Sequence, residues 1–327
     1  MKLSVVLPVF NEAENLLKLR QYLDQVTAGL GVDYEYIFVN DGSADESLQL
    51  LKDMARKDPG HIHYLSFSRN FGQQTAFQAG LDVASGDRIV LMDADLQDPP
   101  SVIARMWAKM DEGYDVVFGQ RRRHKGHSLP VRMLAFIFYR FLRKSSSIAI
   151  PLDTGDFRIF NRKILHILRQ MPEADKFLRG QIAWAGFRQA AVLYDRPGRN
   201  AGKSGYSFWK LAGLAFSGIT GFTLAPLRWV FFTGLILFTL GLIGISGMLV
   251  EQMLDYPGWF TVRETTSSII FIGGVQLLAT GILGQYLGRI LRNTNRRPPY
   301  VIAESSFRER AEGRTIEFPN EQSYFSS

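Results

Sequence analysis

Residues 88–98 read RIVLMDADLQD, an apolar run that leads directly into three acidic side chains. The run has the length and character of a buried strand, and similar apolar runs recur along the first part of the chain. We predict strands at 3–9, 34–40, 61–68, 88–92 and 116–119, with helices at 12–28, 44–57, 72–84 and 101–112. Strands that alternate with helices predict an α/β domain built on a doubly wound sheet.

Ligands of such sheets bind at the carboxyl ends of the strands, so the residues that follow each strand are the first candidates for a site. Polar residues follow strands one, two and four; they are Asn11 and Glu12, Asp41 and Ser43, and Asp93, Asp95 and Gln97. No G-x-G-x-x-G fingerprint follows the first strand, which argues against a nicotinamide or flavin site. The stretch 198–204 is one residue short of a phosphate-binding P-loop, and we interpret it as a different loop that contacts phosphate.

Asp93 and Asp95 form the sharpest chemical feature of the sequence. Two carboxylates one residue apart at the end of a buried strand repel each other unless a cation lies between them. With the amide of Gln97 they make a set of hard oxygen ligands that suits Mg²⁺ or Mn²⁺. The alternative is structural, because Asp also caps helices and forms turns; Asp98 before Pro99 and the turn at Asp41 fit that role too.

The composition excludes several classes of protein. The 327 residues carry a net charge of +7 and contain no cysteine. A disulfide scaffold, a thiolate metal site and a cysteine nucleophile are therefore excluded. The positive charge is local, because residues 116–152 hold eight basic side chains and no acidic one; they are Arg121, Arg122, Arg123, Lys125, Arg132, Arg140, Arg143 and Lys144.

Two segments carry no charged residue, 229–250 and 265–288, and each is long enough to cross a bilayer. We predict two transmembrane helices there; the alternative is a pair of buried helices in a soluble core. The connecting loop 251–264 has a net charge of −2, whereas basic residues lie before the first segment and after the second. The positive-inside rule then places both termini and the first domain on the cytoplasmic side of the inner (plasma) membrane.

This organisation divides the chain into four parts. We predict a catalytic domain over 1–205, an interfacial helix over 206–228, the membrane segment over 229–288 and a cytoplasmic tail over 289–327. We expect the tail from about Ala303 to be mobile or to touch a neighbouring subunit of a homo-oligomer. The basic stretch 116–152 surrounds an apolar helix and is expected to face an anionic lipid bilayer. That interleaving, without any nucleic-acid-binding motif, argues against a nucleic-acid partner.

Three motifs together resemble those of a known family. They are VVLPVFNE at 5–12, VNDGS at 39–43 and DADLQDP at 93–99. They are similar to the family 2 glycosyltransferases with the GT-A fold, and the two expected spans make the chain resemble the polyprenyl-phosphate glycosyltransferases, above all the bacterial bactoprenol glucosyltransferases. The resemblance covers about residues 1–300. The Q-x-x-R-W motif of processive synthases is not met, because Ala225 stands where Gln is required.

The resemblance implies a role for each matching residue. Pro8, Asn11, Glu12 and Asp41, with Ser43 beside them, would line the nucleoside pocket, and Asp93, Asp95 and Gln97 would meet the ribose, the metal and the diphosphate of the donor. Asp156 would face the acceptor. Arg199, Lys203 and Ser204 lie on a loop that matches a flexible basic segment near the phosphates. Arg121 and Arg122 follow the fifth strand and are expected to reach the acceptor phosphate; the alternative for the basic run is a solvated or lipid-binding patch.

These expectations combine into a metal-dependent, inverting glycosyltransferase that moves glucose from UDP-glucose to undecaprenyl phosphate. A phosphate monoester has a second pKa near ~6, so the acceptor is already largely anionic at neutral pH. Asp156 would then orient the acceptor or take a residual proton; its alternative role is a capping carboxylate paired with Arg158. Other open alternatives are a different sugar, such as mannose, N-acetylglucosamine or an aminoarabinose derivative, a membrane-tethered nucleotide-sugar sensor without turnover, and a small transport component.

Overall fold

The computed structural model describes residues 1–121, 154–173, 176–195, 262–295 and 297–307, together with a few positions between 227 and 243. In chain order the elements are β1 (Lys2–Val9), α1 (Ala13–Leu30), β2 (Asp33–Asn40), α2 (Ser47–Lys57), β3 (Ile62–Phe67), α3 (Gln73–Val83), β4 (Arg88–Leu91), α4 (Val102–Asp111), β5 (Val116–Arg121), β6 (Thr154–Asn161), α6 (Arg162–Gln170), α7 (Leu178–Ala185), β7 (Gln189–Tyr194), α10 (Val262–Thr294) and β8 (Ile302–Ser305). All five predicted strands and all four predicted helices are present, with ends that differ by up to three residues.

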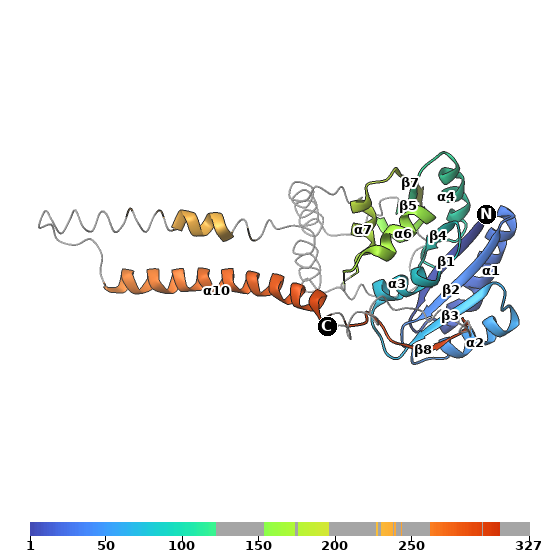
Figure 1. The fold of residues 1–327 in the computed structure, drawn as a ribbon, viewed down its shortest axis with the longest axis horizontal. Coiled ribbons are helices and arrows are strands. Elements are labelled where there is room, and N and C mark those ends of the chain that lie inside the picture. The colour runs from blue at the N-terminus through green and yellow to red at the C-terminus, as the bar shows by residue number, and fades with distance from the viewer. Residues whose placement is uncertain are drawn as a thin grey trace, which may run out of the picture. The chain divides into compact units, whose positions relative to one another are not determined.

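The five predicted strands run parallel to one another, and the whole sheet is mixed because strands that were not predicted join it antiparallel. Its strand order is β7-β5-β6-β4-β1-β2-β3-β8 (Figure 1). Strands β1 to β4 run parallel, but β6 enters between β4 and β5 and is antiparallel to both. Because Leu91 at the end of β4 pairs with Arg158 in the middle of the antiparallel strand β6, the residues that precede Arg158 lie at the carboxyl end of β4.

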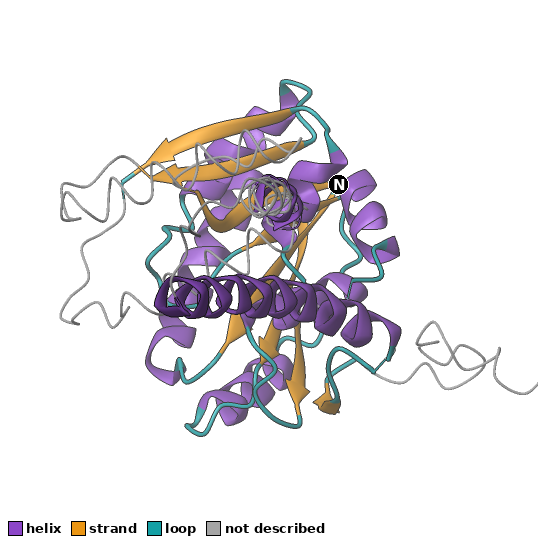
Figure 2. Cartoon of the chain, turned by 90° about the vertical axis from the view of Figure 1, so that its left-hand side faces the viewer, coloured by secondary structure: helices purple, strands orange, loops and turns teal. Residues whose placement is uncertain are grey.

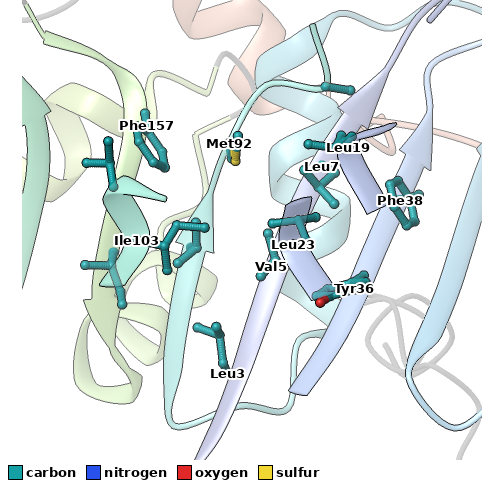
Figure 3. Packing of buried hydrophobic residues seen from close by; sticks show 14 of the residues in the cluster. Leu3, Val5, Leu7, Leu19, Leu23, Tyr36, Phe38, Met92, Ile103 and Phe157 are labelled. Carbon is teal, nitrogen blue, oxygen red and sulfur yellow. The ribbon is translucent and has the colours of Figure 1, made fainter. Parts of the chain in front are cut away.

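Two hydrophobic cores form because alternate residues of each strand face opposite sides of the sheet. Val5 and Leu7 of β1 pack into one core with α1 and α4, whereas Val6 packs into the other with α3, α6 and α7. Figure 3 shows the first core, where Leu19 and Leu23 of α1 meet Tyr36 and Phe38 of β2. Helices flank the strands on both sides (Figure 2). The sheet is thereby fixed as a rigid platform, and its strand ends hold the loops of the site.

The last strand, β8, completes the sheet at the β3 edge. It pairs antiparallel with β3, and the backbone N–H of Ser68 donates to the carbonyl of Val301 at 3.0 Å. Next to it Tyr300 is buried, stacks on Phe67 with ring centroids 5.1 Å apart, and donates its hydroxyl to Asp82 at 2.8 Å. The expectation of a mobile tail from Ala303 is therefore wrong for residues 303–307; residues 308–327 lie outside the described part of the chain.

The chain divides into two compact units. One comprises Met1–Lys125, Pro151–Gly202 and Pro298–Ser327, and the other Gly126–Ile150 and Lys203–Arg297. In the second unit α10 contains the whole of the uncharged segment 265–288. Within the described parts of the chain, we find no helix that is both long and apolar enough to cross a membrane. The two predicted transmembrane helices therefore have no support from these residues, and most of the first segment, 229–250, lies outside them.

Candidate active site at the carboxyl ends of the strands

Hydrogen bonds fasten the loop after β1 to the loop after β2. The backbone N–H of Asn11 donates to Ser43 Oγ at 2.9 Å, and Asn11 Oδ1 accepts from the backbone N–H of Ala44 at 2.8 Å. Asn11 has a φ of 56°, a left-handed conformation that Asn adopts more readily than most residues. The structure thus brings together two of the residues predicted to bind the nucleoside.

Pro8 and Glu12 lie on either side of this junction. Pro8 is opposite Val39 in the β1–β2 ladder. The backbone N–H of Glu12 donates to Ser47 Oγ at 3.0 Å, and its carboxylate accepts from Asn15 Nδ2 at 2.5 Å. Burial raises the pKa of Glu12. Pro8 thus lies within the β1–β2 pair, and Glu12 lies at the start of α1, directly after β1.

Asp41 is buried, and its carboxylate accepts hydrogen bonds from the backbone. The N–H of Phe71 lies 2.6 Å from Oδ1, and the N–H of Gly72 lies 2.9 Å from Oδ2. Burial raises the pKa of Asp41 despite these bonds. A side chain on Gly42, which has a φ of 72°, would lie 2.6 Å from the backbone carbonyl carbon of Arg69. Glycine at position 42 therefore lets the loop after β3 close over Asp41.

The acidic loop after β4 carries Asp93, Asp95 and Gln97. Gln73 Nε2 donates to Asp93 Oδ1, and the backbone N–H of Gln97 donates to Asp95 Oδ1 at 3.0 Å. Between them Leu96 has a φ of 57°, a strained conformation that costs about 1–3 kcal/mol and is typical of functional loops. The three predicted metal and donor residues thus lie on one tightly turned loop.

Asp93 is the group whose ionisation is most strongly perturbed in this region. Burial raises its pKa to about 7, and the neighbouring carboxylates of Asp156 and Asp95 add to the effect. Crowded carboxylates at the end of a strand are a donor set whose repulsion a hard divalent cation relieves. Among the described residues, no three His, Asp, Glu or Cys side chains form a cluster that could hold a metal by itself.

Asp156 of β6 reaches the same region from the opposite strand direction. Its Oδ2 accepts from Gln74 Nε2 at 2.8 Å, and its Oδ1 lies 3.4 Å from Arg179 Nη2 of α7. The buried guanidinium of Arg158 instead donates to the carbonyls of Gly155 and Asp156. The hydrogen bonds of the Asp156 carboxylate thus come from Gln74 and Arg179 rather than from the Arg158 side chain, the partner in the alternative role.

Residues 71–74, which we call the 71–74 segment, join the acidic side chains of three strands. Phe71 and Gly72 bind Asp41 after β2, Gln73 binds Asp93 after β4, and Gln74 binds Asp156 of β6. Sequence reasoning does not single out this segment, because residues 71–74 carry no charged side chain. Their place after the third apolar strand, where the next helix begins, is the signal that could have found them.

Arg121 at the end of β5 is anchored by a buried carboxylate. Its Nη2 lies 3.3 Å from Asp98 Oδ1, so Asp98 binds Arg121. Tyr194 of β7, a residue that sequence reasoning missed, donates to the same carboxylate at 2.5 Å. The other predicted phosphate-binding residues, Arg122, Arg199, Lys203 and Ser204, lie outside the described residues.

Comparison with known proteins finds a matching family and relatives that cover most of the chain. The sequence profile of Glycosyl transferase family 2 matches residues 4–168. An uncharacterised glycosyltransferase of Synechocystis sp. is 38% identical over 93% of this chain and 95% of its own length. The bactoprenol glucosyl transferase of Shigella phage SfII is 36% identical over 93% of this chain and 98% of its own length.

Solved structures are more distant. Glucosyl-3-phosphoglycerate synthase of M. tuberculosis aligns over 67% of this chain and 78% of its own, with a TM-score of 0.45 and 21% identity. TarS of S. aureus in complex with UDP-GlcNAc aligns over 66% and 65%, with a TM-score of 0.44 and 18% identity. The profile match and the full-length relatives decide the assignment: the chain belongs to glycosyl transferase family 2.

Proposed function

We propose that this glycosyltransferase moves glucose from UDP-glucose to undecaprenyl phosphate. Support for the acceptor and the sugar comes from the full-length similarity to a protein named for glucosyl transfer to bactoprenol. The site itself supports a donor that is a nucleoside diphosphate sugar. Asn11, Ser43 and Asp41 follow β1 and β2, where the nucleoside would bind. The acidic loop with Asp93 follows β4, the other neighbour of β1, and the diphosphate would lie there.

Asp93, Asp95 and Gln97 would hold Mg²⁺ or Mn²⁺, which when bound neutralises charge on the leaving diphosphate. The crowding of Asp93 by Asp156 and Asp95 supports this assignment. The bond between Asp95 and the backbone of Gln97 fixes the turn of the loop. The protein's own contribution is therefore a loop that is shaped before the donor arrives.

The observation that carries the proposed reaction is the placement of Asp156. Gln74 and Arg179 hold its carboxylate near the start of β6, close enough to Asp93 to raise the pKa of that residue. A phosphate oxygen of the acceptor would attack the anomeric carbon while the bond to the diphosphate breaks and its electron pair leaves with the nucleoside diphosphate. We assign Asp156 to orienting this acceptor. A single displacement without a covalent intermediate gives inversion at the anomeric carbon.

We further propose that the enzyme acts at the cytoplasmic face of the inner membrane, where its lipid acceptor resides. Support comes from the uncharged segments 229–250 and 265–288 and from the basic run 116–152. On α10, large apolar side chains are exposed to a degree unusual for a water-soluble helix; Leu277 is 75% and Ile269 is 65% exposed. A lipid environment would cover these side chains.

The reaction is tested with the purified full chain in detergent. It would be given Mg²⁺, polyprenyl phosphate and a panel of labelled nucleotide sugars. We expect a lipid-linked product with UDP-glucose that requires the phosphate of the lipid. A product with another nucleotide sugar alone would overturn the choice of glucose, and no product with any member of the panel would overturn the transfer reaction and leave a nucleotide-sugar-binding protein.

The membrane arrangement is tested separately. Because the chain has no cysteine, single cysteines introduced at Ser43 and in the loop 251–264 can be labelled in intact cells with a membrane-impermeant maleimide. We expect labelling of the loop only. Labelling of both sites, or of neither before lysis, would contradict the proposed topology.

A further inference from the structure

Asp98, Tyr194 and Arg121 form a closed set of hydrogen bonds beside the proposed acceptor site. The carboxylate of Asp98 is 1% exposed. It accepts from the Tyr194 hydroxyl at 2.5 Å and lies 3.3 and 3.5 Å from Arg121 Nη2. Arg121 Nε donates to the same hydroxyl oxygen at 3.2 Å. Each member therefore contacts the other two, and we call these three residues the Arg121 clamp.

The sheet brings the clamp together from three distant parts of the chain. Arg121 and Tyr194 are register partners at the ends of the parallel strands β5 and β7. Asp98 closes the acidic loop that begins at Asp93. The clamp therefore connects the loop assigned to the donor diphosphate with the end of β5.

Close packing fixes the ring of Tyr194. A side chain at Gly119 would lie 2.8 Å from Tyr194 Cε1, so only glycine leaves room for the ring. On another side Phe157 meets the ring edge to face, with centroids 5.9 Å apart. The hydroxyl is consequently held where it can donate to Asp98. Burial raises the pKa of Tyr194 to about 12, so the hydroxyl keeps its proton at neutral pH.

The clamp directs the Arg121 guanidinium toward the acceptor residues. A side chain at Gly155 would lie 3.1 Å from Arg121 Nη2, so the guanidinium rests against the residue that precedes Asp156. Its distances to Asp98 are long for charge-assisted bonds, which are typically about 2.7–2.9 Å. The tyrosine hydroxyl takes the short bond to that carboxylate instead. Arg121 thus keeps capacity to bind another anion while its position is fixed.

We propose that Asp98 and Tyr194 are positioning residues that hold the Arg121 guanidinium against Gly155, where it binds the phosphate of the lipid acceptor. This inference rests on the proposed function. A donor diphosphate offers the same phosphate chemistry, but the contact with Gly155, next to Asp156, favours the acceptor. Arginine suits this role because its planar fork can bind a carboxylate on one edge and a phosphate on another.

The test is a KM-against-kcat comparison of Tyr194→Phe, which keeps the ring and removes the hydroxyl. We expect KM for polyprenyl phosphate to rise about tenfold, because the variant loses one hydrogen bond that orients a charged group. KM for UDP-glucose and kcat should both stay within about twofold of the parent values. Tyr36→Phe is the matched control, because Tyr36 is also buried and shares a hydrogen bond with Thr27 at 3.0 Å away from the strand ends. It should leave both KM values unchanged.

A double variant separates positioning from general damage. Arg121→Ala alone should raise KM for the acceptor, and adding Tyr194→Phe to it should have no further effect on that KM. Independent, multiplicative effects of the two substitutions would overturn the proposal. A rise in KM for UDP-glucose, with that for the lipid unchanged, would also overturn it and assign Arg121 to the donor diphosphate.

Direct binding distinguishes this inference from the reaction on which it rests. The affinities of the parent and of Tyr194→Phe for radiolabelled polyprenyl phosphate and for unphosphorylated polyprenol would be measured in detergent. If Tyr194→Phe binds polyprenyl phosphate more weakly than the parent but binds polyprenol equally well, the clamp is supported. Absence of sugar transfer in the same preparation would then count only against the proposed reaction. Equal binding by both proteins overturns the clamp even where transfer proceeds.

Discussion

Gln74 Nε2 lies 2.8 Å from Asp156 Oδ2, and its Oε1 accepts from the backbone N–H of Leu178 at 3.2 Å. One amide therefore joins the start of α3 to the carboxylate of β6 and to the first residue of α7. Since an amide can donate and accept at once, Gln74 fixes the carboxylate relative to two other elements.

We expect Gln74→Leu to lower kcat by about tenfold to hundredfold, because it removes a hydrogen bond to a charged group, worth roughly 1.5–3 kcal/mol. Sugar transfer at saturating donor and acceptor is the measurement. Gln49→Leu is the matched control, since Gln49 bonds to Asp53 on an exposed helix face. Equal kcat in the parent and in Gln74→Leu would show that Asp156 does not need this amide.

Asp95→Asn should abolish transfer and leave the fold intact, because an amide is a far poorer ligand for Mg²⁺ than a carboxylate. The hydrogen bond from Gln97 to Oδ1 can persist in the variant, so the loop keeps its turn. Transfer and the circular dichroism spectrum are measured together, with Asp53→Asn on α2 as the control. Near-normal turnover in Asp95→Asn would refute the metal assignment.

Glu35 should make stability depend on pH in the acidic range. Burial alone would raise the pKa of Glu35, but hydrogen bonds from Lys2, Ser4 and Ser85 outweigh it and hold the pKa below its ordinary value. A depressed carboxyl pKa stabilises the folded state above the unfolded pKa, near 4.5, and this stabilisation is lost as pH falls through the folded value.

Glu35→Gln should therefore lower Tm at pH 7 and have a smaller effect near pH 3. Thermal unfolding of the parent and the variant at the two pH values checks this, with the exposed Glu46→Gln as control. A difference between parent and variant that grows as pH falls would have the wrong sign and contradict the prediction.

Tyr300→Phe should destabilise the domain by about 0.5–1.5 kcal/mol, the usual net contribution of one hydrogen bond. The variant keeps the stacking on Phe67 but removes the hydroxyl that Asp82 accepts from at 2.8 Å. Chemical denaturation provides the measurement, and Tyr22→Phe, at a site that is 48% exposed, is the control. Unchanged stability of Tyr300→Phe would contradict the prediction, since the Asp82 carboxylate would then be held by Gln78 Nε2, 2.7 Å away, without the hydroxyl.

The parts of the fold with strong periodicity were predictable from sequence. The strands around Val5, Phe38 and Val90 are continuous apolar runs, because both faces of the sheet are covered. β6 and β7 were not predicted, since Asp156 and Arg158 interrupt the first and exposed residues such as Leu193 alternate in the second. The antiparallel insertion of β6 depends on long-range pairing that no local pattern reveals.

The charged residues of the site could be foreseen, but their partners could not. Asp93 is predictable as a carboxylate at the end of an apolar strand, whereas Asp156 is expected only from the resemblance to a known family. Gln74 and Tyr194 are ordinary residues in sequence, and only the register of β5 with β7 and the closing of the loop over Asp41 bring them to the site. Asp98 looked like a helix cap because two prolines follow it, whereas it is the buried anchor of Arg121.

The pairing of β8 with β3 sets an order of assembly during synthesis. The ribosome completes residues 302–305 only after α10 has been made, so the β3 edge has no β8 partner until α10 has been translated. An unpaired edge strand is a template for association with other chains. The sheet therefore reaches its full set of strands only after the second unit has been synthesised, and a nascent chain that stalls before Tyr300 leaves the β3 edge without its partner.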